Sequence, residues 1–243
     1  MKKRLLGSLE VKAIISVIIL LAIIFGFNDG SNEFIFSDWV SNLILIIFVV
    51  ALVILVNVLG SKLATKYYGT EIKIKVWNSQ KFKQATTFTK KIMLIYTTPI
   101  LNILVALISN GKIYLSSVMS FDYEKEVMGR KFPYITYFNV GMVVFFGLLF
   151  NLVLMWIFKL LSFEPGLKIS FWFILFSLIP FSELPGARLL TGSITLYVFS
   201  LVFFLANIIL LQAINSFFAL MASIFFSVIV ASLYVFFFRY NSK

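Results

Sequence analysis

Asn57, Val58 and Ser61 have the spacing at which one helix can build a metal site. Asn57 and Ser61 are four residues apart, so they lie on one face of a helix, and Val58 directly follows Asn57. In the zinc motif H-E-x-x-H, these positions carry two histidine ligands and a glutamate that acts as general base. The chain keeps this spacing but has a carboxamide, an isopropyl group and a hydroxyl instead.

The composition excludes several kinds of catalytic site. The chain has no His and no Cys, which removes the common zinc ligands, the common general base, the thiol nucleophile and the disulfide. Ser61 and Lys62 are adjacent, and adjacent helical side chains do not face each other, so a Ser–Lys dyad is disfavoured. Every Asp and Glu falls at or beyond the end of an apolar run. This pattern disfavours aspartyl proteolysis and ion-coupled transport that depends on buried acids.

The overall composition indicates an integral membrane protein. The chain is 61% hydrophobic with a mean hydropathy of +1.01, and several of its apolar runs are long enough to span a bilayer. The net charge of +11 comes from Lys and Arg beside these runs. We therefore expect contact with the lipid bilayer and no nucleic-acid partner.

Six apolar runs predict six transmembrane helices. The first is interpreted as a retained anchor helix, because no small-residue cleavage pattern follows it. The expected fold is an all-α polytopic membrane protein with short membrane-associated β-strands. The predicted crossings are Val11–Phe27, Trp39 to about Ala64, Phe138–Leu161, Ile169 to about Phe181, Thr191–Leu211 and Phe217–Phe238.

The region between the second and third crossings has a different pattern. Glu71–Trp77 alternates charged and apolar residues, which predicts a strand whose apolar face lies on the bilayer or on the helix bundle. Gly111–Leu115 predicts a second short strand. Ile92–Ser109 is long enough to cross, but Pro99 and Asn102 interrupt it, so a re-entrant or kinked segment is expected.

The distribution of Lys and Arg favours the re-entrant arrangement. If residues 92–109 return to the side they came from, 19 of the 21 Lys and Arg fall on one side together with both termini. If they cross fully, only 14 fall on that side. The positive-inside rule therefore predicts a re-entrant segment and a cytosolic N-terminus.

Three blocks of sequence resemble the site-2 protease family of intramembrane zinc metalloproteases, in an archaeal-type member. Val56–Gly69 resembles H-E-L-A-H-K-L-x-A-x-Y-x-G. Gly141–Asn151 resembles G-x-x-x-x-A-G-P-x-x-N, and Ser177–Arg188 resembles N-L-I-P-x-x-P-L-D-G-x-K. The residues that match are Leu59, Lys62, Leu63, Tyr67 or Tyr68, Gly69, Gly141, Gly147, Asn151, Pro180, Leu184, Gly186 and Arg188.

The departures from the family pattern fall on the residues that its chemistry requires. The resemblance places the two metal histidines on Asn57 and Ser61, the catalytic glutamate on Val58 and the third metal ligand on Pro185. A catalytic zinc needs three protein ligands and an open water position. We therefore expect no metal, no cofactor and no catalytic residue. Asn57, Ser61 and Asn151 are expected either to form hydrogen bonds between helices or to line the vacated cavity.

The resemblance implies a single membrane domain over residues 1–243. A site-2 protease-like core covers about residues 10–190, and two C-terminal helices follow at about 191–238. The expected function is that of a pseudoprotease that binds or scaffolds membrane proteins or their transmembrane segments, with the short strands offering an edge for strand addition. The alternatives are an active intramembrane metalloprotease and a small-solute transporter or channel subunit.

Overall fold

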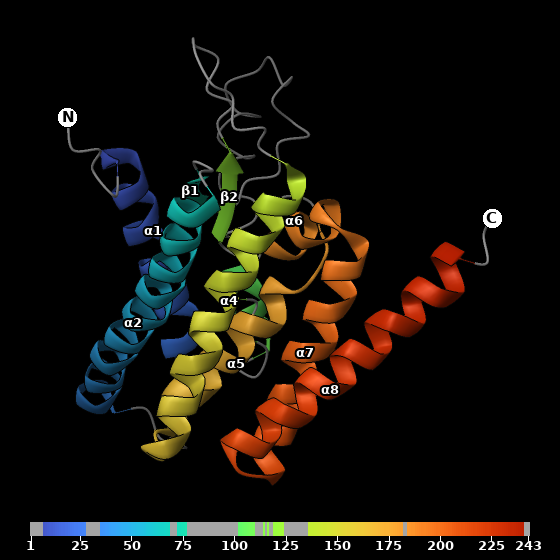
Figure 1. Cartoon of the computed structure of the whole chain (residues 1–243). Helices are drawn as coiled ribbons and strands as arrows, with labels where there is room; N and C mark the ends of the chain where they lie inside the picture. Colours follow the sequence, from blue (N-terminus) through green and yellow to red (C-terminus); the bar gives the residue numbers. More distant parts are fainter. Residues whose placement is uncertain are drawn as a thin grey trace.

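The computed structural model describes residues 7–27, 35–68, 72–76, 102–109, 114, 116, 119–123, 136–181 and 184–240. Figure 1 shows long helices packed side by side, with a small sheet at the end of the bundle where α1 begins. Five helices in the described part of the chain are long and apolar enough to cross a membrane. The predicted all-α polytopic membrane class is therefore confirmed.

Each long helix coincides with a predicted apolar run. At 33 residues, α2 is about 50 Å long, which exceeds the hydrocarbon thickness of about 30 Å, so its ends reach beyond the hydrocarbon layer. The five are α1 (Ser8–Gly26), α2 (Phe36–Tyr68), α4 (Tyr137–Leu160), α7 (Ile194–Ala213) and α8 (Ser216–Tyr234), which continues into the π-helix η2 (Val235–Tyr240).

Two shorter helices connect α4 to α7. The predicted crossing at 169–181 corresponds to α5 (Glu164–Ser177), whose 14 residues rise about 21 Å and so fall short of the full hydrocarbon thickness. The sequence patterns did not predict α6 (Pro185–Gly192) as a separate helix. It begins on a proline, which is favoured in the first turn because no backbone N–H is needed there.

The central helix of the bundle is α4, which contacts α2, α5, α6 and α7. Gly141 on α4 approaches the backbone of α6, where a Cβ atom on Gly141 would lie 3.5 Å from the carbonyl oxygen of Arg188 and 3.6 Å from the Cα of Gly192. Close approach of small residues is a common way for helices to associate in a bilayer. Because α4 contacts most of the other helices, it positions the sequence blocks relative to one another.

The sheet pairs β1 (Ile72–Val76) with β2 (Met119–Tyr123) in antiparallel register. The first predicted strand is therefore confirmed. The described residues contain a second strand at 119–123, which the sequence patterns did not predict. Met119–Tyr123 itself alternates apolar and polar residues, and the register places its apolar positions opposite those of β1. Of the predicted 111–115 strand only Tyr114 is described, and it is not in a strand.

The apolar face of β1 lies on the helix bundle. Ile74 is 3% exposed, and β1 contacts α1. The backbone N–H of Ile74 donates a hydrogen bond to the Glu10 carboxylate at the start of α1, at 3.2 Å. Of the two expected locations for this face, the bilayer or the bundle, the structure therefore shows the bundle.

The chain between the strands returns to the side from which it leaves. Because β1 and β2 pair, a single crossing between them would separate the strands by a membrane. Tyr114 stacks on Phe25, with ring centroids 4.9 Å apart, and Phe25 lies 15 residues, or about 22 Å, along α1 from Glu10. The chain therefore reaches the far end of α1 and comes back, as a re-entrant segment does.

Within this returning segment, residues 102–108 are helical and the side chains of Asn102, Tyr114 and Ser116 are buried. The Ser116 hydroxyl donates to the carbonyl oxygen of Trp172 on α5 at 2.9 Å. Non-helical backbone at membrane depth is tolerated where protein covers it, and α1 and α5 supply that cover. The rest of the predicted segment, 92–101, lies outside the described residues.

In Figure 1, α1 begins and α8 ends on the side of the bundle that carries the sheet. This arrangement agrees with an even number of passes between the two termini. The assignment of that side to the cytosol rests on the Lys and Arg count and stays a prediction.

Candidate functional site

The polar pair on α2 faces α4. Asn57 and Ser61 are each 2% exposed, and both lie against Gly147 of α4. A Cβ atom on Gly147 would stand 3.2 Å from the Asn57 Nδ2 atom and would overlap the Ser61 Oγ atom. The first two sequence blocks therefore meet in space, at the residues that their patterns single out.

Asn151 belongs to the same interface. It follows Gly147 by one helical turn on α4, so it lies on the same face of that helix, and its side chain is fully buried. Within the described part of the chain, the Asn57 Oδ1, the Ser61 Oγ and both terminal atoms of the Asn151 amide have no hydrogen-bond partner. These four atoms form no hydrogen bond between helices in the described part of the chain. Whether the three residues bond neighbouring helices or line a cavity stays a prediction.

Pro185 lies on α6, which packs against a different part of α4. It is buried at the first position of α6, and α6 packs against the part of α4 that includes Gly141. Gly141 and Gly147 are six residues apart, so they point to faces of α4 about 120° apart. The first and third blocks therefore contact the same helix on different faces.

The four family positions do not suit a catalytic zinc. An amide oxygen, a hydroxyl and a proline ring are not the donors that transition metals select, and Val58 supplies no base. Among the described residues, no three His, Cys, Asp or Glu side chains form a group that could hold a metal ion. The arrangement is one of buried, neutral polar groups between two apolar helices.

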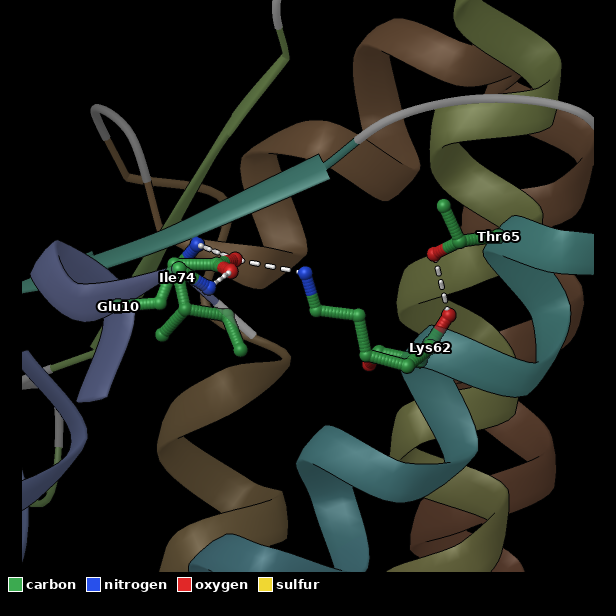
Figure 2. Close-up of polar contacts among 6 residues, drawn as sticks. Glu10, Lys62, Thr65 and Ile74 are labelled. Carbon is green, nitrogen blue, oxygen red and sulfur yellow. Dashed lines mark hydrogen bonds and ion pairs between the residues drawn. The ribbon is translucent and has the colours of Figure 1, made fainter. Parts of the chain in front are cut away.

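A buried ion pair joins α1 to the turn of α2 that contains Ser61 and Lys62. The Lys62 Nζ atom lies 2.6 Å from the Glu10 Oε1 atom, and the Glu10 carboxylate also accepts hydrogen bonds from the backbone N–H groups of Gly7 and Ile74 (Figure 2). Glu10 is 7% exposed. One carboxylate thus joins the start of α1, the end of α2 and the strand β1.

Adjacent residues of α2 therefore face different partners. Ser61 lies against Gly147 of α4, while Lys62 pairs with Glu10 of α1. The Thr65 hydroxyl donates to the Ser61 carbonyl oxygen at 2.6 Å within the same helix (Figure 2). Because Ser61 and Lys62 point to different neighbours, the structure agrees with the expectation that they do not form a Ser–Lys dyad.

Sequence reasoning missed this ion pair. Glu10 lies in the first turn of α1, beside a basic tip, and was grouped with the acids at helix ends. A signal was present, since Glu10 is the only acidic residue before Asp29 and is followed directly by an apolar run. Sequence separation hid the partner, because Lys62 is 52 residues away.

A second polar connection joins α4, α7 and α8. The Trp156 Nε1–H donates to Asn207 Oδ1 at 2.9 Å, and Asn207 Nδ2 donates to the Ser223 hydroxyl at 2.9 Å. Asn207 is fully buried in the middle of an apolar helix. The sequence analysis did not single it out, although an isolated Asn in an apolar run is the usual signal of such a contact.

Asn151 and Asn207 predict opposite results on replacement by leucine. Asn151→Leu removes an amide that has no hydrogen-bond partner among the described residues, so we expect the free energy of unfolding in detergent to rise by about 1 kcal/mol. Asn207→Leu leaves Trp156 and Ser223 without their partner, so we expect a fall of about 1 kcal/mol. Reversible denaturation followed by circular dichroism measures both. A fall for Asn151→Leu equal to that for Asn207→Leu contradicts the assignment.

Comparisons of the chain with protein-family models, with curated proteins and with solved structures find no match. The resemblance to site-2 proteases therefore rests on the three sequence blocks themselves.

Proposed function

We propose that the chain is a catalytically inactive, site-2 protease-like membrane protein that binds other membrane proteins or their transmembrane segments. The observation that carries the proposal is the contact of Asn57 and Ser61 with Gly147. Two blocks that resemble the family's motif helices are neighbours in space, and the positions of the metal ligands within them hold neutral polar groups. This contact supports the interpretation of a vacated site, and the chemistry required for cleavage is missing.

A chain that lacks the catalytic groups can still keep the surfaces that bind a partner segment. An intramembrane protease has to admit a transmembrane segment and hold part of it extended. In this chain a two-stranded sheet sits beside the turn of α2 that carries Ser61 and Lys62, held there by Glu10. The N–H of Ile74 donates to Glu10, which occupies the edge of β1 away from β2. An extended partner segment would therefore add along β2.

Photo-crosslinking in native membranes tests the binding function. A photoreactive amino acid at position 122, on the strand β2 along which the partner would add, is expected to capture a membrane protein that mass spectrometry identifies. The matched control places the same group at Phe225, which is 64% exposed on α8, far along the chain from the sheet. If position 122 yields no protein product above the level at position 225, the scaffold proposal loses its support.

Metal analysis tests the inactivity of the site separately. The purified chain is expected to contain far less than one zinc per molecule, because its family positions offer no histidine, thiolate or carboxylate ligand. Stoichiometric zinc that survives dialysis against a weak chelator would show an unrecognised metal site and would revive the protease alternative.

A further inference from the structure

The turn of α2 that carries Lys62 marks the edge of the hydrocarbon layer on the side of the sheet. From Trp39 up to Lys62, α2 has no charged residue over a rise of about 35 Å, which covers the hydrocarbon thickness of about 30 Å. Trp39 and the exposed Tyr67 are about 42 Å apart along α2, and such aromatic residues favour the two headgroup layers of a membrane. The residues of α2 beyond Lys62 therefore lie among the headgroups.

The contacts of Glu10 bring lysines from two segments together at this depth. Glu10 pairs with Lys62 of α2 and accepts a hydrogen bond from the backbone N–H of Ile74 of β1 (Figure 2). Lys66 follows Lys62 by one helical turn, and Lys73 directly precedes Ile74. The side chains of Lys66 and Lys73 are both exposed. The ion pair thus places exposed basic residues of α2 and β1 beside each other.

Two further lysines extend this surface. Lys12 is exposed near the start of α1, where the apolar run of that helix begins. Lys75 lies on the same face of β1 as Lys73, because strand side chains alternate, and the buried Ile74 lies on the opposite face against the bundle. Lys73 and Lys75 therefore point away from the bundle. The four residues Lys12, Lys66, Lys73 and Lys75 are the basic surface.

The basic surface stays positive after the neighbouring acids are counted. In the part of the chain that the structure describes, the acids beside it are Glu10, which pairs with Lys62, and Asp122, which lies opposite Lys73 in the sheet. With Lys62 included, five lysines stand against two carboxylates, which leaves a charge of +3. Clusters of four or more Lys or Arg beside a transmembrane helix attract anionic lipid headgroups.

We propose that the basic surface binds the headgroups of anionic phospholipids in the leaflet on the side of the sheet. The depth of the surface favours lipid over an acidic segment of another protein, because phosphate groups are always present among the headgroups. This inference depends on the chain spanning a membrane and does not depend on the proposed pseudoprotease function.

Native mass spectrometry of the full chain tests the proposal. The protein is purified in detergent that contains equal amounts of phosphatidylglycerol and phosphatidylcholine with the same acyl chains. We expect the unaltered chain to retain more phosphatidylglycerol than phosphatidylcholine. The double variant Lys66→Gln/Lys73→Gln spares the structural Lys62 and is expected to lower the ratio of the two retained lipids about thirtyfold.

The matched control removes two positive charges from the other end of the bundle. Lys159 lies in the last turn of α4 and Lys168 near the start of α5, and α4 ends and α5 begins away from the sheet (Figure 1). The double variant Lys159→Gln/Lys168→Gln lowers the net charge by the same amount and is expected to leave the lipid ratio unchanged.

Equal retention of the two lipids by the unaltered chain overturns the proposal, and so does a ratio that Lys66→Gln/Lys73→Gln leaves unchanged. An equal fall in the control variant would show a general effect of net charge and also overturns it. If Lys66→Gln/Lys73→Gln instead releases an acidic protein that co-purifies from native membranes, the surface binds that protein and not lipid. Thermal melting is expected to be the same for all variants, so that a changed lipid ratio reports on the surface and not on the fold.

Discussion

Glu10→Ala is expected to lower the free energy of unfolding by about 3 kcal/mol. The carboxylate is 7% exposed, and it pairs with Lys62 while accepting hydrogen bonds from Gly7 and Ile74. Its removal leaves a largely buried ammonium group and two backbone N–H groups without their acceptor. Removing one member of a buried pair costs far more than the pair itself is worth, because the remaining charge stays desolvated.

The matched control is Glu164→Ala. Glu164 also lies in the first turn of a helix, α5, but it is exposed. This control reproduces the loss of a favourable charge at a helix N-terminus, which is worth about 0.3–1 kcal/mol. Denaturation in detergent is the measurement for both variants, and equal losses for Glu10→Ala and Glu164→Ala would show that the ion pair contributes nothing beyond the helix dipole.

The double variant separates the charge from the backbone contacts. Lys62→Met in the Glu10→Ala background removes the stranded ammonium group and is expected to recover part of the lost stability. Recovery is incomplete, because Ile74 still lacks its acceptor and the strand β1 loses its attachment to α1. Increased proteolysis near residues 72–76 in both Glu10 variants is the accompanying observation expected.

Apolar runs predicted the fold because each long helix needs about 20 consecutive apolar residues to cross a bilayer. Such a run is visible in the sequence itself, and all five long helices coincide with one. The strand β1 was equally visible in its alternating pattern. Pairing between distant segments cannot be seen in the sequence, and β2 was not predicted because its register depends on β1, 43 or more residues away.

The candidate site was predictable only in part for the same reason. The motif spacing identified Asn57, Ser61 and Gly147, and the structure brings them together. The motif spacing could not predict that Lys62 pairs with Glu10. An ion pair leaves no periodic pattern in the sequence, and these two residues are 52 positions apart. Similarly, no local pattern joins Asn207 to Trp156, which lies on another helix.

Gly147→Ala is expected to lower the free energy of unfolding by about 2 kcal/mol, although alanine is the better helix former by about 1 kcal/mol. The added methyl group overlaps the Ser61 hydroxyl and approaches Asn57, so α2 and α4 have to move apart. The matched control is Gly141→Ala on the same helix. Its added Cβ has as its nearest neighbour the end of the flexible Leu196 side chain, at 3.1 Å, so a near-neutral effect is expected.

Ser61→Ala is expected to rescue Gly147→Ala, because it removes the atom that the new methyl group overlaps. In a double-mutant cycle, the two substitutions together should be more stable than the sum of their separate effects by at least about 1 kcal/mol. Strict additivity would mean that the two positions are not in contact. The cycle therefore tests, in solution, whether the first and second sequence blocks are neighbours, which is the premise that the vacated-site interpretation and the proposed pseudoprotease function share.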